Sequence, residues 1–183
     1  MSRLLARIWR GLRGPAQWWI LWATHAQFIA GITGLVRNDA GHVLLLRHRL
    51  WPPQHQWGLP TGYAKRRETF EATIVREVKE ETGLAVTVGP LVQLTSGYQL
   101  RIEVAYAAQL TGGALKLDPL EVLDAGWFPV TELPTGTLPA HRQLIKANTA
   151  WYARGANTAE TTDECPDAEP PICRSRPLPP PAT

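Results

Sequence analysis

The chain has 183 residues, 44% of them hydrophobic and 19% charged, which is enough apolar material for the core of one soluble domain. Its net charge of +3 comes from the first 38 residues, which hold five arginines and no acid, so the remainder carries −2 and does not resemble a basic nucleic-acid-binding domain. The two cysteines, Cys165 and Cys173, form no CxxC pair, which excludes a disulfide framework or zinc site and favours free thiols in a reducing cytoplasm.

Residues 1–27 are predicted to form a basic, tryptophan-rich N-terminal arm. This arm holds four of the eight tryptophans, and its arginines recur every three or four residues, along one side of a helix. Gly14 and Pro15 should end that helix and start a second, short one. The arginines on the first helix are Arg3, Arg7, Arg10 and Arg13.

Two interpretations of the arm stay open. Its apolar part, residues 18–32, is interrupted by polar residues and is shorter than the roughly 20 apolar residues that span a bilayer. The first interpretation is an amphipathic helix that lies on an anionic membrane surface with its tryptophans in the interfacial layer. The second is a helix that packs its tryptophans on the domain or on a second subunit.

Residues 28–154 are predicted to form one α/β domain. Strands at 29–36 and 43–46 flank a turn at 38–41 and form a hairpin. A helix at 69–82 should end at Gly83, and strands are expected at 84–94, 99–110 and 121–128. A last helix is expected at 137–154, with Thr137 as its N-cap and Gly155 after its end. Strands mixed with two helices indicate a layered domain.

Residues 155–183 are predicted to be a disordered tail. They hold seven of the sixteen prolines and few large apolar residues, so they cannot bury enough surface to fold.

The helix expected at 69–82 carries the residues that indicate chemistry. Glu77, Glu80 and Glu81 stand at positions i, i+3 and i+4, so their side chains share one face and repel one another. A divalent cation removes that repulsion, and oxygen ligands without sulfur or imidazole select Mg²⁺ or Mn²⁺. The opposite side of this helix is expected to be buried and carries Ala72, Val75 and Val78.

Two further residues of this segment are expected to orient the carboxylates. Glu68 stands near the helix start, where negative charge suits the helix dipole, and Arg76 can hold one glutamate in a bidentate pair. A bound divalent ion lowers the pKa of an attacking water and neutralises charge on a leaving phosphate. The segment therefore predicts transfer of a phosphoryl group to water.

Residues 62–84, GYAKRRETFEATIVREVKEETGL, resemble the Nudix box, whose pattern is G-x5-E-x7-R-E-U-x-E-E-x-G-U with U aliphatic. Every fixed position of the pattern is matched. The loop at 57–60 before the box and Trp127–Phe128 after it are also similar to the family, and the resemblance covers residues 28–153. The matching positions are Gly62, Glu68, Arg76, Glu77, Val78, Glu80, Glu81, Gly83 and Leu84.

The resemblance implies a Nudix-type layered α/β/α sandwich with a mixed β-sheet. It also implies an enzyme that cleaves a phosphoanhydride bond of a nucleoside diphosphate linked to another moiety, X, by water attack. Glu77, Glu80 and Glu81 would hold Mg²⁺, or Mn²⁺, with help from the carbonyl of Thr61, where relatives commonly have glycine. Arg76 and Glu68 would be the orienting residues.

The resemblance leaves the general base and the substrate contacts to be found outside the box. Glu121 is the preferred base because it begins a strand after a loop, and Glu103 is the second candidate. Arg47, Arg49 and Lys65 are candidates for binding substrate phosphates, with ordinary solvated surface charge as the alternative. The chain has no SQPWPFPxS-like segment of the kind found in NADH-cleaving members.

The alternative function is a catalytically weak Nudix-like module that binds nucleotides or regulates without cutting them. The intact glutamates favour the enzyme. We expect a nucleotide-type substrate, no nucleic-acid partner and a cytoplasmic protein, with peripheral contact at the inner membrane surface if the first interpretation of the arm holds. A homodimer is compatible with the resemblance.

Overall fold

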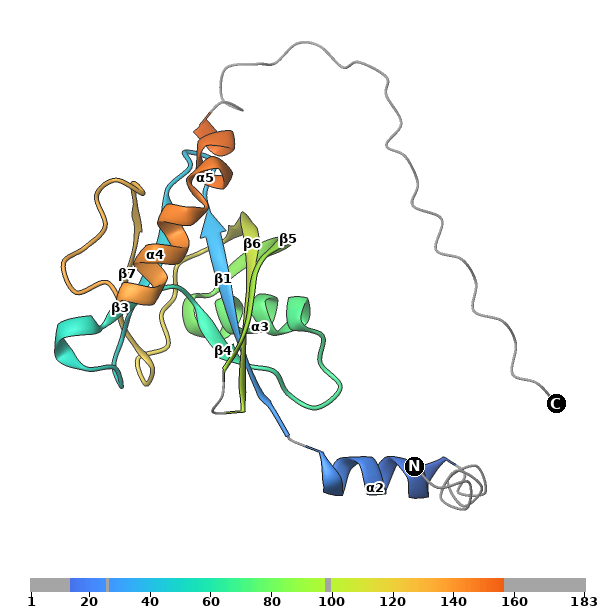
Figure 1. Cartoon of the computed structure of the whole chain (residues 1–183). Helices are drawn as coiled ribbons and strands as arrows, with labels where there is room; N and C mark the ends of the chain where they lie inside the picture. The colour runs from blue at the N-terminus through green and yellow to red at the C-terminus, as the bar shows by residue number, and fades with distance from the viewer. Residues whose placement is uncertain (1–13, 26, 98–99, 157–183) are drawn as a thin grey trace, which may run out of the picture.

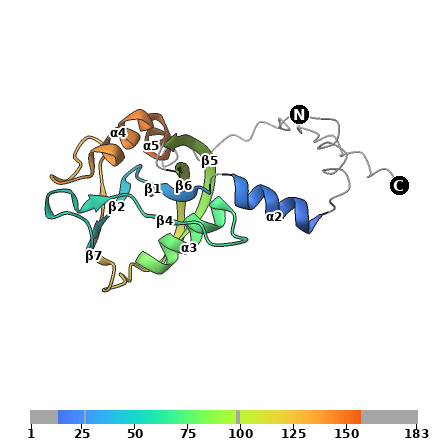
Figure 2. The ribbon, with the colours of Figure 1, turned by 60° about the horizontal axis from the view of Figure 1, so that its bottom comes forward.

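The computed structural model describes residues 14–25, 27–97 and 100–156. The predicted arginine helix before Gly14, most of the predicted tail and both cysteines lie outside these ranges. The described residues form a central sheet with helices on both of its faces and one helix, α2, that stands apart from them (Figures 1 and 2).

The main helices and strands occur in the predicted order. The strands are β1 Ile29–Arg37, β2 Val43–His48, β3 Trp57–Gly58, β4 Thr61–Tyr63, β5 Leu84–Gly97, β6 Arg101–Gly113 and β7 Val122–Phe128. The helices are α2 Pro15–Thr24, the 3₁₀ turn η1 Pro53–His55, α3 Phe70–Thr82, α4 Pro139–Ala147 and α5 Thr149–Ala156.

The seven strands form one mixed sheet in the order β3-β2-β1-β6-β5, with β4 paired to β1 and β7 to β2. Strand β1 is central and runs parallel to β6 from Ile29 opposite Arg101 to Arg37 opposite Gln109. The other pairings are antiparallel. The mixed sheet expected from the sequence is confirmed.

Each face of the sheet carries its own apolar core. On one face Ile32 and Leu46 pack against Ile74 and Val78 of α3. Helices α4 and α5 cover the other face. They contribute Leu144, Ile145 and Tyr152 to the second core. These two cores confirm the predicted α/β/α layering.

The strand directions bring several strand ends together at one end of the sheet, which we call the pocket end. Strands β1 and β6 begin there because they are parallel, and β2 and β4 end there because they run antiparallel to β1. Strand β7 also begins there, since Val122 pairs with His48 at the end of β2.

The prediction of a single helix at 137–154 was wrong. Two helices, α4 and α5, are separated at Asn148, which has φ −117° and ψ 26° and donates its side-chain amide to the Leu144 carbonyl. Thr137 does not cap α4, because its hydroxyl donates to Pro134 O at 2.7 Å and Leu138 holds the cap position. Gly155 lies within α5.

The predicted buried side of α3 was only partly right. Val78 is buried, but Ala72 and Val75 are exposed. The helix turns Thr73, Ile74 and Glu81 inward instead, so one of the three predicted metal carboxylates shares the buried face.

Candidate active site

Helix α3 begins and ends at residues that satisfy its backbone. The Thr69 hydroxyl accepts a hydrogen bond from Ala72 N at 3.2 Å, which satisfies a free amide of the first turn. Gly83 ends the helix with φ 73°, a left-handed conformation that suits glycine. The ends of the helix that carries the glutamates are therefore fixed locally.

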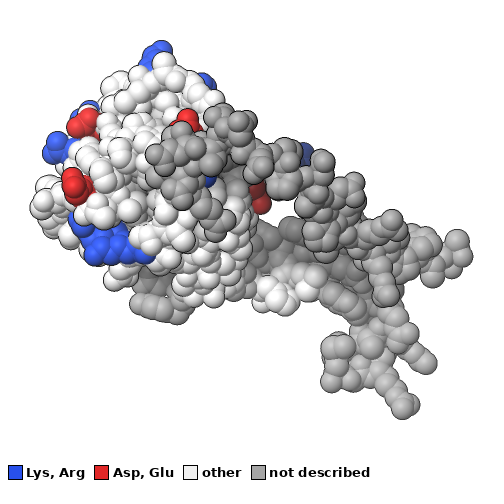
Figure 3. Space-filling view, turned by 90° about the horizontal axis from the view of Figure 1, so that it is seen from above, with Lys and Arg blue, Asp and Glu red and all other residues white. Residues whose placement is uncertain are grey.

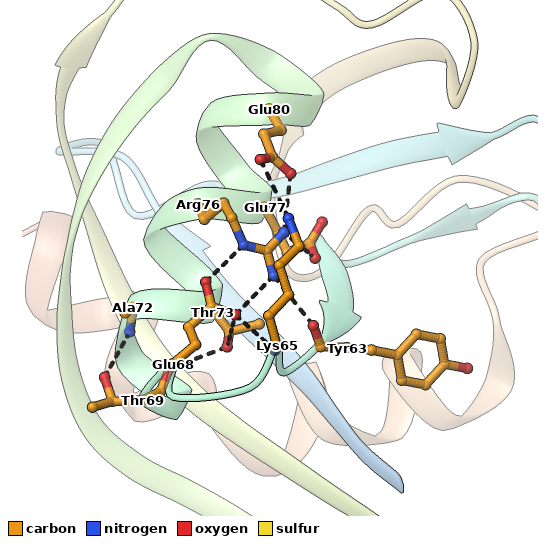
Figure 4. Close-up of polar contacts among 9 residues, drawn as sticks. All are labelled: Tyr63, Lys65, Glu68, Thr69, Ala72, Thr73, Arg76, Glu77 and Glu80. Atoms are coloured by element: carbon orange, nitrogen blue, oxygen red, sulfur yellow. Dashed lines mark hydrogen bonds and ion pairs between the residues drawn. The ribbon is translucent and has the colours of Figure 1, made fainter.

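Arg76 is the centre of a charged network on this helix (Figure 4). Its Nε and Nη2 donate to the two oxygens of Glu68 at 2.7 and 3.0 Å, a bidentate pair. Its Nη1 donates to Glu77 Oε1 at 2.6 Å and to Glu80 Oε2 at 3.0 Å. The guanidinium also reaches the Tyr63 carbonyl at 3.2 Å, so it ties α3 to the strand before the box.

Glu68 also holds the loop that leads into α3. Its Oε2 accepts from Lys65 N and from the Thr73 hydroxyl, each at 3.0 Å. Hydrogen bonding by Arg76, and then by the Lys65 amide, lowers the pKa of Glu68 to about 2. The same pairing with Glu68 raises the pKa of Arg76.

Gly62 is required by the close approach of Glu77. A Cβ at position 62 would lie 2.0 Å from the Glu77 carboxyl carbon, which no side chain can accommodate without moving. The first glycine of the box thus lets a carboxylate of α3 pack against the backbone of β4.

Glu81 is the buried member of the acidic face, with only 3% of its surface exposed. Its Oε1 lies 3.8 Å from His48 Nδ1, and its Oε2 is buried with no hydrogen-bond partner. Burial, with repulsion from Glu77, Glu121 and other acids, raises the pKa of Glu81 to about 9. Burial also lowers the pKa of His48 to about 4, so the two side chains face each other uncharged at neutral pH rather than as an ion pair.

The acidic face opens into a pocket of about 550 Å³ at the pocket end of the sheet. Glu77, Glu81 and Glu121 line it on one side, and Lys65 and Arg101 bring positive charge to the same space. Burial also raises the pKa of Glu77, although the Arg76 hydrogen bond opposes that shift. The acidic side chains of the pocket are therefore concentrated around Glu77, Glu81 and Glu121.

A second pocket of about 260 Å³ adjoins the first. Both are lined by Trp51, Thr61 and Arg101, and the second also by Glu103 and His141. Two neighbouring pockets with shared walls suit a ligand with two parts.

The two candidate bases lie in different places. Glu121 lines the acidic pocket, one residue before β7 starts, and its carbonyl accepts from Arg49 N at 2.8 Å. Glu103 forms an ion pair with Arg101 on β6 and lines the second pocket. The structure thus brings Glu121, and not Glu103, together with Glu77 and Glu81.

Only one of the three candidate phosphate-binding residues reaches the pocket. Lys65 lines it and lies 3.7 Å from Glu80. Arg47 is exposed and donates to Gln56, while Arg49 donates twice to the Pro119 carbonyl and holds a loop. Thr61 also lines the pocket, with its hydroxyl donating to Ile32 O at 3.0 Å.

The carboxylate oxygens of the acidic face suit a hard cation, although they do not surround a common point. Among the described residues no three acidic, histidine or cysteine side chains stand close enough together to hold a metal ion as they are. The reason lies in Arg76, which already bonds Glu77 and Glu80. The unpartnered, buried Glu81 oxygen and the oxygen-only acidic face remain the features that a divalent cation would satisfy.

Four pocket residues were not found from the sequence. His48 was not among the predicted site residues, yet strand alternation places it on the face of Leu44 and Leu46, toward α3. Trp51, which stacks on His48 at 4.0 Å, Tyr63 and Arg101 lie in loops or at strand ends, where periodicity gives no signal.

Comparison with known proteins gives a consistent family. The family model described as NUDIX domain matches residues 27–148. The NAD-capped RNA hydrolase NudC of Vibrio atlanticus (strain LGP32) is 39% identical over 133 residues, covering 68% of this chain and 46% of that protein. The 8-oxo-dGDP phosphatase NUDT18 of Mus musculus is 35% identical over 110 residues, covering 58% and 34%. The chain thus spans less than half the length of these curated relatives.

Solved structures agree at the level of the fold. A NUDIX hydrolase from Nitrosomonas europaea superposes with a TM-score of 0.62 at 19% identity, covering 72% of this chain and 75% of that one. A MutT NUDIX hydrolase from Burkholderia pseudomallei gives a TM-score of 0.56 at 25% identity, covering 67% and 98%. With its complete box on a capped helix, the chain belongs to the NUDIX domain family.

Proposed function

We propose that the chain is a Mg²⁺-dependent hydrolase, with Mn²⁺ as a substitute, that cleaves a phosphoanhydride bond in a nucleoside diphosphate linked to another moiety. The observation that carries this proposal is the buried, unpartnered oxygen of Glu81 beside Glu77 in an acidic pocket. Burying this acid without a partner is costly, whether it keeps its charge or takes up a proton, so its presence here is best explained by a cationic ligand that it binds as the carboxylate.

Glu77, Glu80 and Glu81, with the carbonyl of Thr61, would hold the metal ion. When bound, the ion lowers the pKa of a water molecule and neutralises charge on the phosphates. Arg76 keeps Glu77 and Glu80 within reach of each other, and Glu68 keeps Arg76 in place.

We assign the general base to Glu121, the one candidate base that shares the pocket with the acidic face. It accepts a proton as the water oxygen forms its bond to phosphorus. The bridging P–O bond breaks, and its electron pair leaves with the departing phosphate. Lys65, which lines the same pocket and lies 3.7 Å from Glu80, binds substrate phosphates.

The two adjoining pockets support a two-part substrate, because one can hold the diphosphate and the other the nucleoside or the group X. Names of relatives do not choose between substrates, since one acts on NAD-capped RNA and another on 8-oxo-dGDP. The chain also lacks the SQPWPFPxS-like segment of NADH-cleaving members. The panel to test therefore contains sugar nucleotides, ADP-ribose, dinucleoside polyphosphates and oxidised nucleoside triphosphates.

The test is hydrolysis of this panel with and without Mg²⁺, measured as release of phosphate, pyrophosphate and nucleoside monophosphate. We expect Mg²⁺-dependent release that is lost in Glu81→Gln and in Glu121→Gln. The matched control is Glu132→Gln, an exposed acid outside both pockets, which should keep wild-type turnover.

A second candidate function is a catalytically weak module that binds nucleotides. The observation in its favour is that Arg76 engages two of the three carboxylates expected to bind metal. Nucleotide binding without turnover across the panel, measured by calorimetry, would select this function over hydrolysis.

We also propose a cytoplasmic protein that forms homodimers. Sedimentation velocity tests the second part, because a concentration-independent species of 20.3 kDa contradicts it. The structure contains no helix in its described residues with the length and apolarity that crossing a membrane requires.

A further inference from the structure

Helix α2 exposes an unusual amount of apolar surface. Trp18 and Trp19 are 70% and 67% exposed, Trp22 and Leu21 are also exposed, and no residue of the helix is buried. Between Pro15 and Thr24 the helix has no charged residue at all. A contiguous apolar surface of this kind marks a binding site for another molecule or for a membrane.

The folded domain carries a matching set of exposed apolar side chains. Fifteen large hydrophobic side chains are exposed in the described residues. Four of them belong to α2 and six more belong to this set in the domain, so ten of the fifteen lie toward one end of the molecule. The members in the domain are Phe28, Ile29, Leu50, Tyr63, Leu100 and Leu120.

Strand order explains why these residues lie together. Ile29 begins β1, and its amide bonds Leu100 O at 2.9 Å, just before β6. Tyr63 ends β4, which runs antiparallel to β1. Leu50 and Leu120 flank the start of β7 at the end of β2, so all of these residues lie at the pocket end. Helix α2 lies beyond the same end, next to the start of β1 (Figure 1). From above, at the opposite end, basic and acidic side chains lie close to one another (Figure 3).

Positive charge accompanies this apolar surface. Ala64 N bonds Ala30 O at 3.2 Å, so the loop that follows, with the exposed Lys65, Arg66 and Arg67, leaves the domain beside the start of β1. In the sequence, the fourteen residues before α2 contain four arginines, and no acid occurs before Asp39.

The nearby acids cancel this charge only in part. Lys65 is paired with Glu80, Glu68 with Arg76 and Glu103 with Arg101, while Glu77 and Glu81 line the pocket. Arg66 and Arg67 are exposed and form no ion pair within the described residues, so the outer surface of the pocket end combines apolar side chains with the positive charge of these two arginines.

We infer that α2 and the pocket end together bind the surface of an anionic lipid bilayer. Tryptophan prefers the layer between water and acyl chains, where its ring is buried and its N–H stays hydrated. Basic residues next to such a surface are attracted to anionic headgroups. The vesicle experiment below distinguishes a bilayer from a protein partner that covers the same apolar residues.

Docking in this orientation brings the active-site pocket to the headgroup layer. Leu50, Tyr63 and Lys65 belong both to the pocket lining and to the docking surface. A substrate held at the bilayer would then enter the pocket without leaving the interface. The docking inference itself does not depend on the proposed hydrolysis.

The test is co-sedimentation of the full-length chain with vesicles of phosphatidylcholine alone or mixed with phosphatidylglycerol. We expect binding to the mixed vesicles that weakens with salt and drops at least about tenfold in the Trp18→Ser, Trp19→Ser, Trp22→Ser variant, because interfacial binding scales with buried apolar area. Arg66→Gln with Arg67→Gln should weaken binding to the anionic vesicles only. The matched control is Leu115→Ser, an exposed leucine outside this surface.

Each outcome bears on the inference separately from the proposed activity. Equal sedimentation of the wild type, the tryptophan variant and the control would overturn it. A dimer in sedimentation velocity that the tryptophan variant dissolves, without vesicle binding, would assign the surface to a second copy and also overturn it. Far-ultraviolet circular dichroism checks that the variants fold, and hydrolysis of soluble substrates should be unchanged in the tryptophan variant.

Discussion

Two glycines of the box are fixed by what surrounds them. At Gly62 the neighbour is the side chain of Glu77, and at Gly83 it is the backbone oxygen of Ala114, 2.8 Å from where a Cβ would stand. Gly83 in addition needs its positive φ. The first glycine therefore serves the site and the second serves the helix end.

Gly62→Ala is expected to lower the affinity for Mg²⁺ much more than the stability of the fold. The new methyl group would displace the Glu77 carboxylate from its place against β4, whereas the helix that carries Glu77 is capped elsewhere. Titration of activity with Mg²⁺ should show a higher half-saturating concentration. Gly97→Ala, whose Cβ would meet only Arg101 O at an ordinary 3.6 Å, is the control and should leave the titration unchanged.

Glu81→Gln is expected to stabilise the metal-free protein while it removes metal binding. Because burial raises the pKa of Glu81 to about 9, folding of the metal-free protein at neutral pH requires this acid to take up a proton, and that uptake costs free energy that a glutamine does not incur. Thermal unfolding in EDTA should therefore give a higher midpoint for the variant than for the wild type. Adding Mg²⁺ should raise the midpoint of the wild type only, and an equal rise in both proteins would contradict the assignment of Glu81 as a ligand.

Sequence reasoning located the acidic residues but not their environments. Spacing alone placed Glu77, Glu80 and Glu81 on one face, whereas in the structure Glu77 is half-buried, Glu80 is exposed and Glu81 is buried. That difference depends on the rotation of α3 against the sheet, which Ile74 and Val78 set by packing. A helical repeat cannot give this rotation when apolar residues such as Val75 also occur on the exposed side.

At the scale of elements, the Arg76–Glu68 pair joins α3 to the loop that precedes it. The bidentate contact spans eight residues, and the Arg76 guanidinium reaches the Tyr63 carbonyl of β4 as well. Loss of this pair should loosen the approach to the helix together with the orientation of Glu77 and Glu80.

The pair also predicts how stability depends on pH. The folded-state pKa of Glu68 lies near 2, below the ordinary value of 4.5, so its contribution is fully present above pH 4.5 and is lost as the pH falls toward 2. The wild type should therefore exceed Glu68→Gln in thermal midpoint at pH 6, and the difference should shrink between pH 4.5 and 2. A difference that stays constant over this range would show that the Glu68 charge is not what stabilises the loop.

The elements themselves were largely predictable because their signals are local. Helix α3 ends at Gly83 as predicted, and its start differs by one residue because Thr69, expected as its first residue, is its N-cap. The break between α4 and α5 was missed because Asn148 carries no strong helix-breaking signal, and the side chains on both sides of it pack into the same core. Tertiary packing, which the sequence does not display, decided that boundary.

At the scale of the whole molecule, the folded unit continues beyond residue 148, where the family match ends. Helix α5 inserts Tyr152 into the second core, and the Arg37 guanidinium lies 4.1 Å from the ring of Trp151 and donates to its carbonyl at 2.6 Å. The predicted domain end at 154 stays a prediction, but these contacts show that α5 packs as part of the folded domain.

Two substitutions at Tyr152 should separate the contribution of the buried ring from the cost of burying its hydroxyl group. Tyr152→Ala empties a fully buried aromatic site and should lower the free energy of unfolding by about 3–5 kcal/mol, as for other large core truncations. Tyr152→Phe removes a buried hydroxyl that has no hydrogen-bond partner, so it should leave stability unchanged or raise it. Urea unfolding measures both, with Leu115→Ala on the exposed surface as the control. A large loss in Tyr152→Phe would mean that the hydroxyl is satisfied, and a negligible loss in Tyr152→Ala would mean that α5 does not belong to the folded unit.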